Sequence, residues 1–526
     1  MALSSATLLI LSFPSFNQTW AAWVALVPWF VVLQDLTPRR AFWWSYLIGL
    51  VFFLGSIWWL VHVTVVGWLV LCAYLALYFA LFGWFVHREI RNTRYEIRLL
   101  IAIPSTWVAL EYLRAHALSG FGWNLLGYSQ TSWLPIIQIA DVTGVWGVSF
   151  LLVMVNVVIA RLVADRSPSR HRGSLIGVGL CLLGVLSYGQ LRLQPLPATE
   201  PVKVAVVQGN IPQEQKWDEA SKEFIWKQYE RLTHEAATSQ PDLIIWPETS
   251  VPGFLVADVT LTEQVRSLAT SVQTPLLVGA PVVEPQRRKL FNSAALVNAD
   301  GSIHHRYDKL HLVPFGEFIP GEAWLPQLRS LLPPIGDFLP GSDYTVFTIP
   351  SQKSEVSATK PGGSADHVGG RSQNTSAFRI PHSPLKFSVL ICFEDIFPDL
   401  ARRFVRQGAQ WLVVITNDAW FGKTAAAYQH AQASTLRAVE LRVPVIRSAN
   451  TGWSGCIAAT GRWIVSVRDA QGEELFVEGL AACDVAASEV STLYERWGDW
   501  WAILCVLLVA GFAIIPPPAG RPMAGR

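Results

Sequence analysis

The sequence predicts a membrane α-helical bundle joined to an α/β layered domain. Of its 526 residues, 51% are hydrophobic and 15% are charged, whereas about a quarter of the residues of a typical soluble domain are charged. Long apolar stretches fill the N-terminal part of the chain, and one more lies near the C-terminus. The segment between them alternates short β-branched runs with amphipathic stretches, which is typical of an α/β fold. We therefore expect one domain inside a bilayer and one outside it.

Eight apolar stretches are candidates for membrane helices, which need about 20 apolar residues. They lie at 2–13, 20–35, 41–60, 62–86, 98–116, 146–164, 173–190 and 500–516. The first two are short. A cleaved signal peptide is the alternative for the first, but it lacks a basic start and Pro14 interrupts it, so we expect a retained helix. The stretches divide the chain into a membrane domain with about seven helices (1–195), an outer domain (196–490) and a C-terminal membrane helix with a short tail (491–526).

Arginines in the short loops predict the orientation in the membrane. If the N-terminus is cytoplasmic, the loops and the tail on the cytoplasmic side contain Arg39, Arg40, Arg88, Arg91, Arg94, Arg98, Arg161, Arg166, Arg170, Arg172, Arg521 and Arg526. The short loops on the other side contain only Arg114. Cytoplasmic loops of membrane proteins carry an excess of basic residues. The pattern therefore predicts that both termini are cytoplasmic and that residues 191–498 are extracytoplasmic.

The outer domain is expected to begin after Pro195 and to combine strands with helices. The predicted strands are Val202–Gln208, Asp242–Trp246, Leu276–Gly279, Ser293–Val297, Phe387–Ile391, Trp411–Ile415 and Val445–Ser448. Amphipathic helices are predicted at Glu219–Ser239 and Ala425–Arg442. The stretch Ser351–Thr375 is rich in Ser, Gly, Lys and Gln without periodicity, so we expect a disordered surface insertion there.

Aromatic residues crowd the predicted membrane segments. The tryptophans there include Trp20, Trp43, Trp44, Trp58, Trp59, Trp84 and Trp107. Tryptophan is typical of the membrane–water interface, and direct lipid contact by some of these side chains is the alternative. The loop Ser119–Gly144 is too polar and glycine-rich to span a bilayer. We expect it to lie at the membrane interface, near the site of the outer domain.

Three predicted strands run directly into residues that carry reactive or polar groups. Glu248 follows the strand at 242–246, Cys392 follows 387–391, and Asn417 follows 411–415. Ligand sites in α/β sheets form beyond the carboxyl ends of strands, so these three side chains are candidates for one pocket. A cysteine becomes a nucleophile when a base takes its proton and a cation favours the thiolate. Glu248, which follows the apolar Trp246 and Pro247, suits the base, and Lys309 is an available cation, with a surface lysine as its alternative interpretation.

The remaining cysteines and histidines do not indicate a metal site. The chain has six cysteines and eleven histidines, without a CxxC pair or an HExxH motif. His304, His305 and His311 fit an exposed strand and loop better than a metal site. Whether Cys456 and Cys483 pair stays open at the level of sequence. The net charge of +2 gives no indication of a nucleic-acid partner, and none is expected.

Four ordered motifs in the outer domain resemble the nitrilase superfamily, which uses a Glu-Lys-Cys triad. They are WPE at 246–248, YDKLHLVPFGE at 307–317, CFED at 392–395 and TNDAWFG at 416–422, and RSANTGWSG at 447–455 is similar to the region after that family's last core helix. The HLVPFGE run, the preceding membrane segments and TLYERWGDW at 492–500 resemble the apolipoprotein N-acyltransferase branch over nearly the whole chain. The resemblance implies a nitrilase-like α-β-β-α sandwich inserted before a final transmembrane helix.

The resemblance also implies a role for individual residues. Glu248 would be the general base, Lys309 the oxyanion stabiliser and Cys392 the nucleophile. The backbone N–H of Phe393 would be a second oxyanion donor. Glu317 would hold Lys309, and Glu394 would act chemically or as a structural hydrogen-bonding carboxylate.

Further residues are expected around the site. Asn417, Trp246 and Trp420 would line the pocket, with plain packing as the alternative for both tryptophans. Arg437 and Glu440 are expected to form a structural pair. The branch commonly has tyrosine after the nucleophile where this chain has Phe393, so that hydroxyl is not essential here.

The resemblance implies acyl transfer without a metal or another cofactor. Cys392 would take a fatty acyl group from the sn-1 ester of a phospholipid as a thioester and pass it to the N-terminal amine of a diacylglyceryl-cysteine apolipoprotein. The expected location is the bacterial inner membrane, with the catalytic domain periplasmic. One alternative is a membrane-anchored amidase or nitrilase that uses water as acceptor. Another is a non-catalytic transporter or scaffold, against which the complete triad argues.

Overall fold

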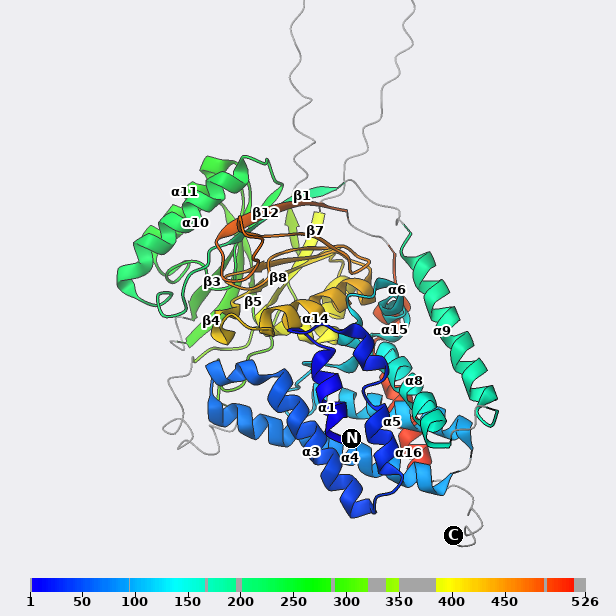
Figure 1. Cartoon of the computed structure of the whole chain (residues 1–526). Coiled ribbons are helices and arrows are strands. Elements are labelled where there is room, and N and C mark those ends of the chain that lie inside the picture. The colour runs from blue at the N-terminus through cyan, green and yellow to red at the C-terminus, as the bar shows by residue number, and fades with distance from the viewer. Residues whose placement is uncertain are drawn as a thin grey trace, which may run out of the picture.

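The computed structural model describes residues 2–93, 95–165, 169–194, 201–284, 289–319, 337–349, 385–486 and 490–514. Its membrane region consists of α1 (Ala2–Leu11), α2 (Val27–Leu33), α3 (Pro38–Ser56), α4 (Val65–Asn92), α5 (Glu96–His116), α8 (Val145–Asp165), α9 (Arg172–Arg192) and α16 (Trp500–Ile514). Figure 1 shows these helices together on one side of a sheet-containing domain. Among the described helices, α4, α8 and α9 are long and apolar enough, by length and composition, to cross a membrane.

The other apolar stretches differ from the sequence expectation in length or in charge. The stretch predicted at 20–35 is not one helix, because the 3-10 turn Thr19–Trp23 precedes the seven-residue α2. Helices α1 and α16 have 10 and 15 residues, fewer than the roughly 20 that a straight span needs. Helices α3 and α5 have 19 and 21 residues but carry charged side chains. The number of spans therefore stays a prediction.

The outer domain contains two six-stranded sheets. The first has the order β12-β1-β2-β3-β4-β5 and the second the order β11-β10-β9-β8-β7-β6. The strands of the first sheet are β12 (Gly479–Val485), β1 (Val202–Gln208), β2 (Leu243–Ile245), β3 (Leu276–Glu284), β4 (Lys289–Val297) and β5 (Ile303–Asp308). The strands of the second are β11 (Trp463–Ser466), β10 (Gly455–Ile457), β9 (Val445–Ala449), β8 (Trp411–Thr416), β7 (Leu385–Ile391) and β6 (Phe347–Ile349). In each sheet three central strands, β1-β2-β3 and β7-β8-β9, run parallel.

Helices cover the outer faces of both sheets, which confirms the predicted α-β-β-α sandwich. Helices α10 (Lys222–Ala237) and α11 (Val259–Val272) pack on the first sheet, and α13 (Pro398–Arg406) and α14 (Ala426–Leu441) pack on the second. Successive residues of β1 alternate between the layers: Val204 and Val206 join the core between the sheets, and Ala205 and Val207 face α10 and α11. This is the two-residue period of a strand buried on both faces.

Helix α14 is also the layer through which the sandwich contacts the membrane helices (Figure 1). Its residues Ala426, Ala433, Leu436 and Val439 belong to the core of the membrane region. Gln429 of α14 accepts hydrogen bonds from Nε1 of Trp59 (3.0 Å) and Trp123 (2.9 Å) and donates to the carbonyls of Pro14 and Ser56. A buried glutamine thus ties three segments of the membrane region to the sandwich.

Two of the tryptophans expected at the membrane surface are buried instead. Trp59 and Trp107 are 2% and 6% exposed, because they pack inside the bundle and beneath α14, so the interface prediction is wrong for them. Trp20, Trp43, Trp44, Trp58 and Trp84 are exposed. The loop predicted at 119–144 forms a 3-10 turn (Leu126–Gln130) and the short helices α6 (Leu134–Ile137) and α7 (Ala140–Thr143), and its segment 122–131 is buried between bundle and sandwich rather than lying on the membrane surface.

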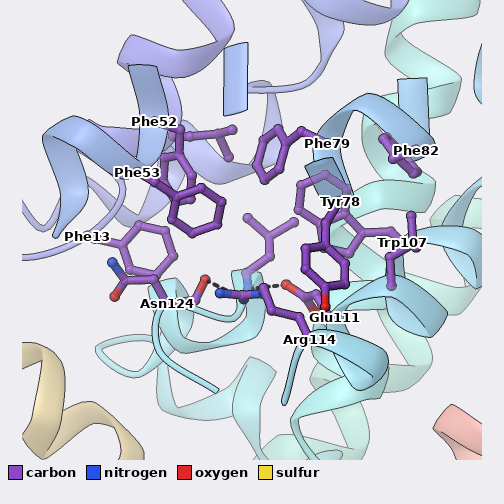
Figure 2. A pocket seen from close by; sticks show the side chains of 13 residues that line it. Phe13, Phe52, Phe53, Tyr78, Phe79, Phe82, Trp107, Glu111, Arg114 and Asn124 are labelled. Carbon is purple, nitrogen blue, oxygen red and sulfur yellow. Dashed lines mark hydrogen bonds between the residues drawn. The ribbon is translucent and has the colours of Figure 1, made fainter. Parts of the chain in front are cut away.

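Arg114, the exception to the arginine pattern, is buried beneath this loop. Its guanidinium donates hydrogen bonds to the carbonyls of Trp123 (2.7 Å) and Asn124 (3.4 Å). Glu111, one helical turn earlier, accepts the backbone N–H of Leu126 (2.7 Å). Figure 2 shows these charged groups at one end of a small cavity whose other end is aromatic. Arg114 therefore supports a buried loop and does not indicate on which side of the membrane this loop lies.

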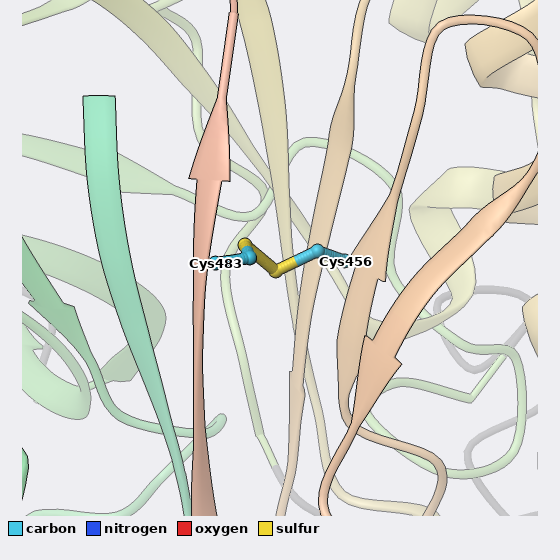
Figure 3. The surroundings of a disulfide bond; sticks show 2 residues. All are labelled: Cys456 and Cys483. Carbon is cyan, nitrogen blue, oxygen red and sulfur yellow. A yellow bond between two sulfur atoms is a disulfide. The ribbon is translucent and has the colours of Figure 1, made fainter. Parts of the chain in front are cut away.

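Cys456 of β10 and Cys483 of β12 form a disulfide (Figure 3). Because β10 belongs to the second sheet and β12 to the first, the bond links the two sheets of the sandwich. The pairing that the sequence left open is thereby decided. The insertion predicted at 351–375 lies outside the described residues.

Candidate active site

Glu248 lies in the loop that follows β2, and the residue is only 6% exposed. Its Oε1 accepts a hydrogen bond from Nδ2 of Asn292 (2.7 Å), and its Oε2 accepts the backbone N–H of Asn417 (2.9 Å). A Cβ on Gly279 of β3 would stand 2.3 Å from the carbonyl oxygen of Pro247 and 2.7 Å from the Cα of Glu248. Glycine at that position therefore lets the loop descend onto the sheet and hold the carboxylate in place.

Lys309 directly follows β5 and is 1% exposed. Its Nζ lies 2.9 Å from Oε1 of Glu317 and 3.7 Å from Oε1 of Glu248. Burial lowers the pKa of Lys309, but the carboxylates of Glu317 and Glu248 outweigh it, so the net pKa is raised above its usual value. The ammonium is therefore charged at neutral pH and available to a negative charge that develops nearby.

Asn292 of β4 joins the same group, and the sequence reasoning did not identify it. Its Nδ2 donates to Oε1 of Glu317 (3.0 Å) as well as to Glu248, and its backbone carbonyl accepts the N–H of Lys309 (2.8 Å). One amide group thus lies between two carboxylates that would otherwise repel each other. The second oxygen of Glu317 accepts the N–H of Val313 (2.8 Å), which fixes the loop after Lys309.

Cys392 is the first residue after β7, and its φ is +55°. This left-handed conformation is unfavourable for a residue with a Cβ, by about 1–2 kcal/mol. The side chain is half-buried. Burial and the negative charge of Glu248 raise the pKa of the thiol, and the positive charge of Lys309 lowers it. The resting thiol is therefore protonated and lies within the electrostatic reach of both a base and a cation.

Glu394 is fully buried and serves as a structural carboxylate. It accepts the Tyr307 hydroxyl (2.8 Å), the N–H groups of Leu310 (2.7 Å) and His311 (3.0 Å), and the N–H of Ile391 (2.7 Å). Burial raises its pKa to about 7. Of the two roles expected from the sequence, the hydrogen bonds favour the structural one, because they bind the Lys309 loop to the strand that carries Cys392.

Asn417 and Lys216 both donate hydrogen bonds to Glu248. Besides its N–H bond to Glu248, Asn417 donates through Nδ2 to Gln213 (2.7 Å) and accepts Nδ2 of Asn450 (3.0 Å). Lys216, which the sequence reasoning missed, donates to the carbonyl of Glu248 (3.0 Å). Burial lowers the pKa of Lys216 to about 8, against the opposing charges of Glu248 and Cys392. Its place in the loop after β1 was the available signal, since the carboxyl end of β1 meets the same sheet edge.

The three predicted aromatic residues lie in different environments. Phe393 is half-buried and packs against His311 and Phe397, with ring centroids 6.0 and 5.1 Å apart. Trp420 is 52% exposed, in the 3-10 turn Asp418–Phe421. The pocket-lining prediction is wrong for Trp246: it is fully buried, stacks on Tyr229 and donates through Nε1 to Thr233 of α10. Because Trp246 follows Ile245, which faces the inner core, it points to the opposite side of the sheet.

The structure thus gathers Glu248, Lys309, Glu317 and Cys392 at one edge of the sandwich. Chemically, the group offers a nucleophile, a carboxylate that can take its proton and a cation for an oxyanion. The predicted pair of Arg437 and Glu440 is present elsewhere, fully buried on α14 with 2.6 Å between Nη2 and Oε2.

Comparisons with known proteins identify the family of the chain. The apolipoprotein N-acyltransferase N-terminal domain model matches residues 5–158, and the carbon-nitrogen hydrolase model matches residues 203–490. The chain is similar to the apolipoprotein N-acyltransferase of Geobacter metallireducens, with 37% identity over 99% of this chain and 95% of the relative. The corresponding protein of Methylococcus capsulatus is 33% identical over 97% of this chain and 94% of its own length. Among solved structures, Nit3 of Saccharomyces cerevisiae, a member of branch 10 of the nitrilase superfamily, is 18% identical with a TM-score of 0.37, covering 55% of this chain and 91% of that chain.

These matches confirm the nitrilase-like domain and the acyltransferase resemblance that the motifs predicted. The membrane-length helices and the bacterial sources of the relatives identify a bacterial membrane protein. Since both matched models and the relatives together span almost the whole chain, the protein belongs to the apolipoprotein N-acyltransferase family.

Proposed function

We propose that this enzyme moves a fatty acyl group from a phospholipid, through a thioester on Cys392, to the N-terminal amine of a diacylglyceryl-cysteine apolipoprotein. The observation that carries the proposal is the group of Glu248, Lys309 and Cys392. The chain also aligns with 95% of the length of a relative that bears the name of this activity. Residues 1–195 would supply the membrane domain and residues 196–490 the catalytic domain.

In the first half-reaction, the Sγ of Cys392 attacks the carbonyl carbon of the ester while Glu248 takes the thiol proton. A C–S bond forms, and the carbonyl oxygen becomes an oxyanion that Lys309 and the N–H of Phe393 would stabilise. Collapse of this intermediate breaks the C–O bond, and the proton on Glu248 passes to the glycerol oxygen. The products are the acylated cysteine and a lysophospholipid.

In the second half-reaction, the apolipoprotein amine attacks the thioester and Glu248 takes a proton from the nitrogen. The C–N bond forms, the C–S bond breaks, and the proton returns to the sulfur. The thioester must survive until the amine arrives, so water has to be kept away from it. The half-buried Phe393 and the aromatic rings of Phe397 and His311 beside it support such exclusion.

We further propose that the catalytic domain is periplasmic and that both termini are cytoplasmic. The arginine distribution supports this orientation, and the buried Arg114 removes its one exception. The disulfide between Cys456 and Cys483 supports it independently, because disulfides persist in the bacterial periplasm and are rare in the cytosol. Both lipid substrates would then reach the site from the outer leaflet of the inner membrane.

The test is to incubate the purified protein in phospholipid nanodiscs without an acceptor and to analyse the peptide that contains Cys392 by mass spectrometry. We expect an acyl adduct on Cys392, stoichiometric lysophospholipid release, and both lost in C392A. The matched control is C181A, which removes a free cysteine in α9 far from the sheets. The absence of both adduct and lysophospholipid would refute the proposal, and ammonia release from a small amide would favour the amidase alternative.

A further inference from the structure

A second group of buried charges lies directly beneath the nucleophile. Asp395, Asp418, His430 and Arg447 are each no more than 1% exposed. They come from the turn after β7, the turn after β8, α14 and β9. None of these four side chains has a part in the proposed chemistry. The burial of four ionisable groups is energetically unfavourable unless the groups form ion pairs and hydrogen bonds with one another, so their arrangement requires an explanation.

His430 lies at the centre of this group. Its Nδ1 is 3.0 Å from Oδ1 of Asp418, and its Nε2 is 2.8 Å from Oδ1 of Asp395. Arg447 completes the ring with Nη1 2.9 Å from Oδ2 of Asp395 and Nη2 3.3 Å from Oδ2 of Asp418. Two carboxylates, a guanidinium and an imidazolium together carry no net charge, so the group is balanced only when His430 is protonated.

The protonation state of His430 agrees with that balance. Burial and the positive charge of Arg447 lower its pKa, but Asp395 and Asp418 raise it, and the net pKa is about 9. Both ring nitrogens therefore carry protons at neutral pH and both donate. A Cβ on Gly452 would stand 2.1 Å from Oδ2 of Asp418, so the absence of a side chain at position 452 makes room for this carboxylate.

The Nε2–H of His430 also reaches the nucleophile. It donates a hydrogen bond to the backbone carbonyl of Cys392 (3.2 Å), the residue with φ of +55°. On the other side of the same turn, Glu394 accepts the N–H of Ile391 (2.7 Å). A strained conformation persists only where its surroundings determine it strongly, and these two buried side chains hold the turn from both sides.

The loop Ser119–Gly144 of the membrane region covers the imidazole of His430. The ring of Trp123 lies with its centroid 5.2 Å from that of His430, and its Nε1 donates to Gln429, the residue before His430. Arg114 donates a hydrogen bond to the backbone carbonyl of Trp123 (2.7 Å). Water is thereby kept from the charged group, which strengthens its internal interactions.

We propose that His430 is a positioning residue: held as a cation between Asp395 and Asp418, it fixes the carbonyl of Cys392 and so orients the thiol. The inference rests on the proposed role of Cys392 as nucleophile. Loss of the imidazolium would leave the group with one net negative charge and the nucleophile turn without one of its two supports. The thiol would then lose a proton less readily and would be less well aimed at the ester.

The experiment compares full-length wild type, H430A and H430Q in nanodiscs by two measurements. The first is the pH profile of Cys392 alkylation by iodoacetamide, followed on its own peptide by mass spectrometry without added acceptor. The second is the rate of acyl-enzyme formation. We expect the alkylation profile of both variants to move to higher pH and acylation to fall roughly tenfold to hundredfold in H430A, the effect of losing a hydrogen bond to a charged group. H430Q, which keeps an N–H donor but no charge, should lie between wild type and H430A in acylation.

The matched control is H87A, which removes another buried histidine that bonds a backbone carbonyl, that of Leu33, far from the site. It should leave both measurements unchanged. An unshifted alkylation profile in H430A overturns the proposal, and if H430A does not fold, an unshifted profile in H430Q overturns it instead. Failure of the wild type to acylate would refute the proposed function alone, since alkylation needs no lipid chemistry.

Discussion

Replacement of Asn292 by leucine tests how the two carboxylates of the site are held. Leucine has the branched shape of asparagine, with a larger volume. Oδ1 of Asn292 has no hydrogen-bond partner among the described residues, so N292L removes the donor Nδ2 without the loss of another hydrogen bond of that side chain. The donor serves Oε1 of Glu248 at 2.7 Å and Oε1 of Glu317 at 3.0 Å. The expected consequence is a misplaced base in an otherwise folded protein.

The magnitude follows from what remains at each carboxylate. Glu317 keeps the Nζ of Lys309 at 2.9 Å, whereas for Oε1 of Glu248 the same Nζ is 3.7 Å away, beyond hydrogen-bond distance. The main loss is therefore one hydrogen bond to a charged group at Glu248, about 2 kcal/mol. If Glu248 depends on that bond for its position, the rate of acyl-enzyme formation should fall about 30-fold.

The assay is single-turnover acylation of Cys392 in nanodiscs, measured from the adduct and from lysophospholipid release. Asn298, which follows the same strand and donates through Nδ2 to Ser302 (2.9 Å) outside the site, provides the control variant N298L. We expect N298L to acylate as fast as wild type. A rate for N292L within about twofold of wild type would show that Asn292 does not position the base, and the assignment of Glu248 would then need another support.

Three further outcomes are expected. The pKa of His430 is raised from 6.5 to about 9, so its cationic form stabilises the fold fully below pH 6.5. The free energy of unfolding should therefore fall by roughly 3 kcal/mol between pH 6.5 and 9. Thermal unfolding at several pH values should show this fall in the wild type, and the same fall in H430Q would contradict the assignment. G279A places a Cβ against the loop that carries Glu248 and should slow acylation at least about tenfold. In the control variant G184A the added Cβ has no atom within 4 Å, so its acylation rate should equal that of the wild type. An equal rate for G279A would show that the loop moves aside without loss of function. Reduction of the disulfide, or C456S, should lower the free energy of unfolding by about 3–4 kcal/mol, because the disulfide closes a loop over 27 residues. The loss should appear as a lower Tm, while acylation of Cys392 persists. An unchanged Tm would contradict this.

Much of the outer domain was predictable because each central strand is a short apolar run bounded by polar residues. The predicted strand Val202–Gln208 coincides with β1, and Trp411–Ile415 differs from β8 by one residue. The prediction placed Glu248 and Cys392 at the carboxyl ends of strands, where ligand sites form. The sequence did not show that β2 and β7 belong to different sheets, and the site forms where the strand ends of both sheets meet, as the bond from the N–H of Asn417 to Glu248 shows. Lys309 was predictable only through the resemblance, since it follows an edge strand with exposed residues and no apolar periodicity.

The residues that sequence reasoning missed depend on tertiary contacts rather than on pattern. Asn292 lies where β4 begins earlier than its apolar run suggested, and nothing local distinguishes it from another polar residue on a strand. His430 lies inside a predicted helix, and its partners Asp418, Asp395 and Cys392 are 12, 35 and 38 residues away in the sequence. Trp246 was misplaced because a strand buried on both faces shows no polar alternation, so the sequence does not tell which face is inner.

The contacts of α14 bear on why such a site should be joined to a helical bundle. Gln429 forms hydrogen bonds to segments of the helical bundle, and the next residue, His430, forms one to the carbonyl of Cys392. Consecutive residues of α14 therefore contact both domains. Trp123 contacts both of these side chains from the membrane loop. An enzyme that needed the membrane only as an anchor for a soluble amide would gain nothing from such contacts, since one helix would hold it in place. Support of the nucleophile by the bundle instead fits a reaction whose substrates lie in the bilayer, and this favours acyl transfer over the amidase alternative.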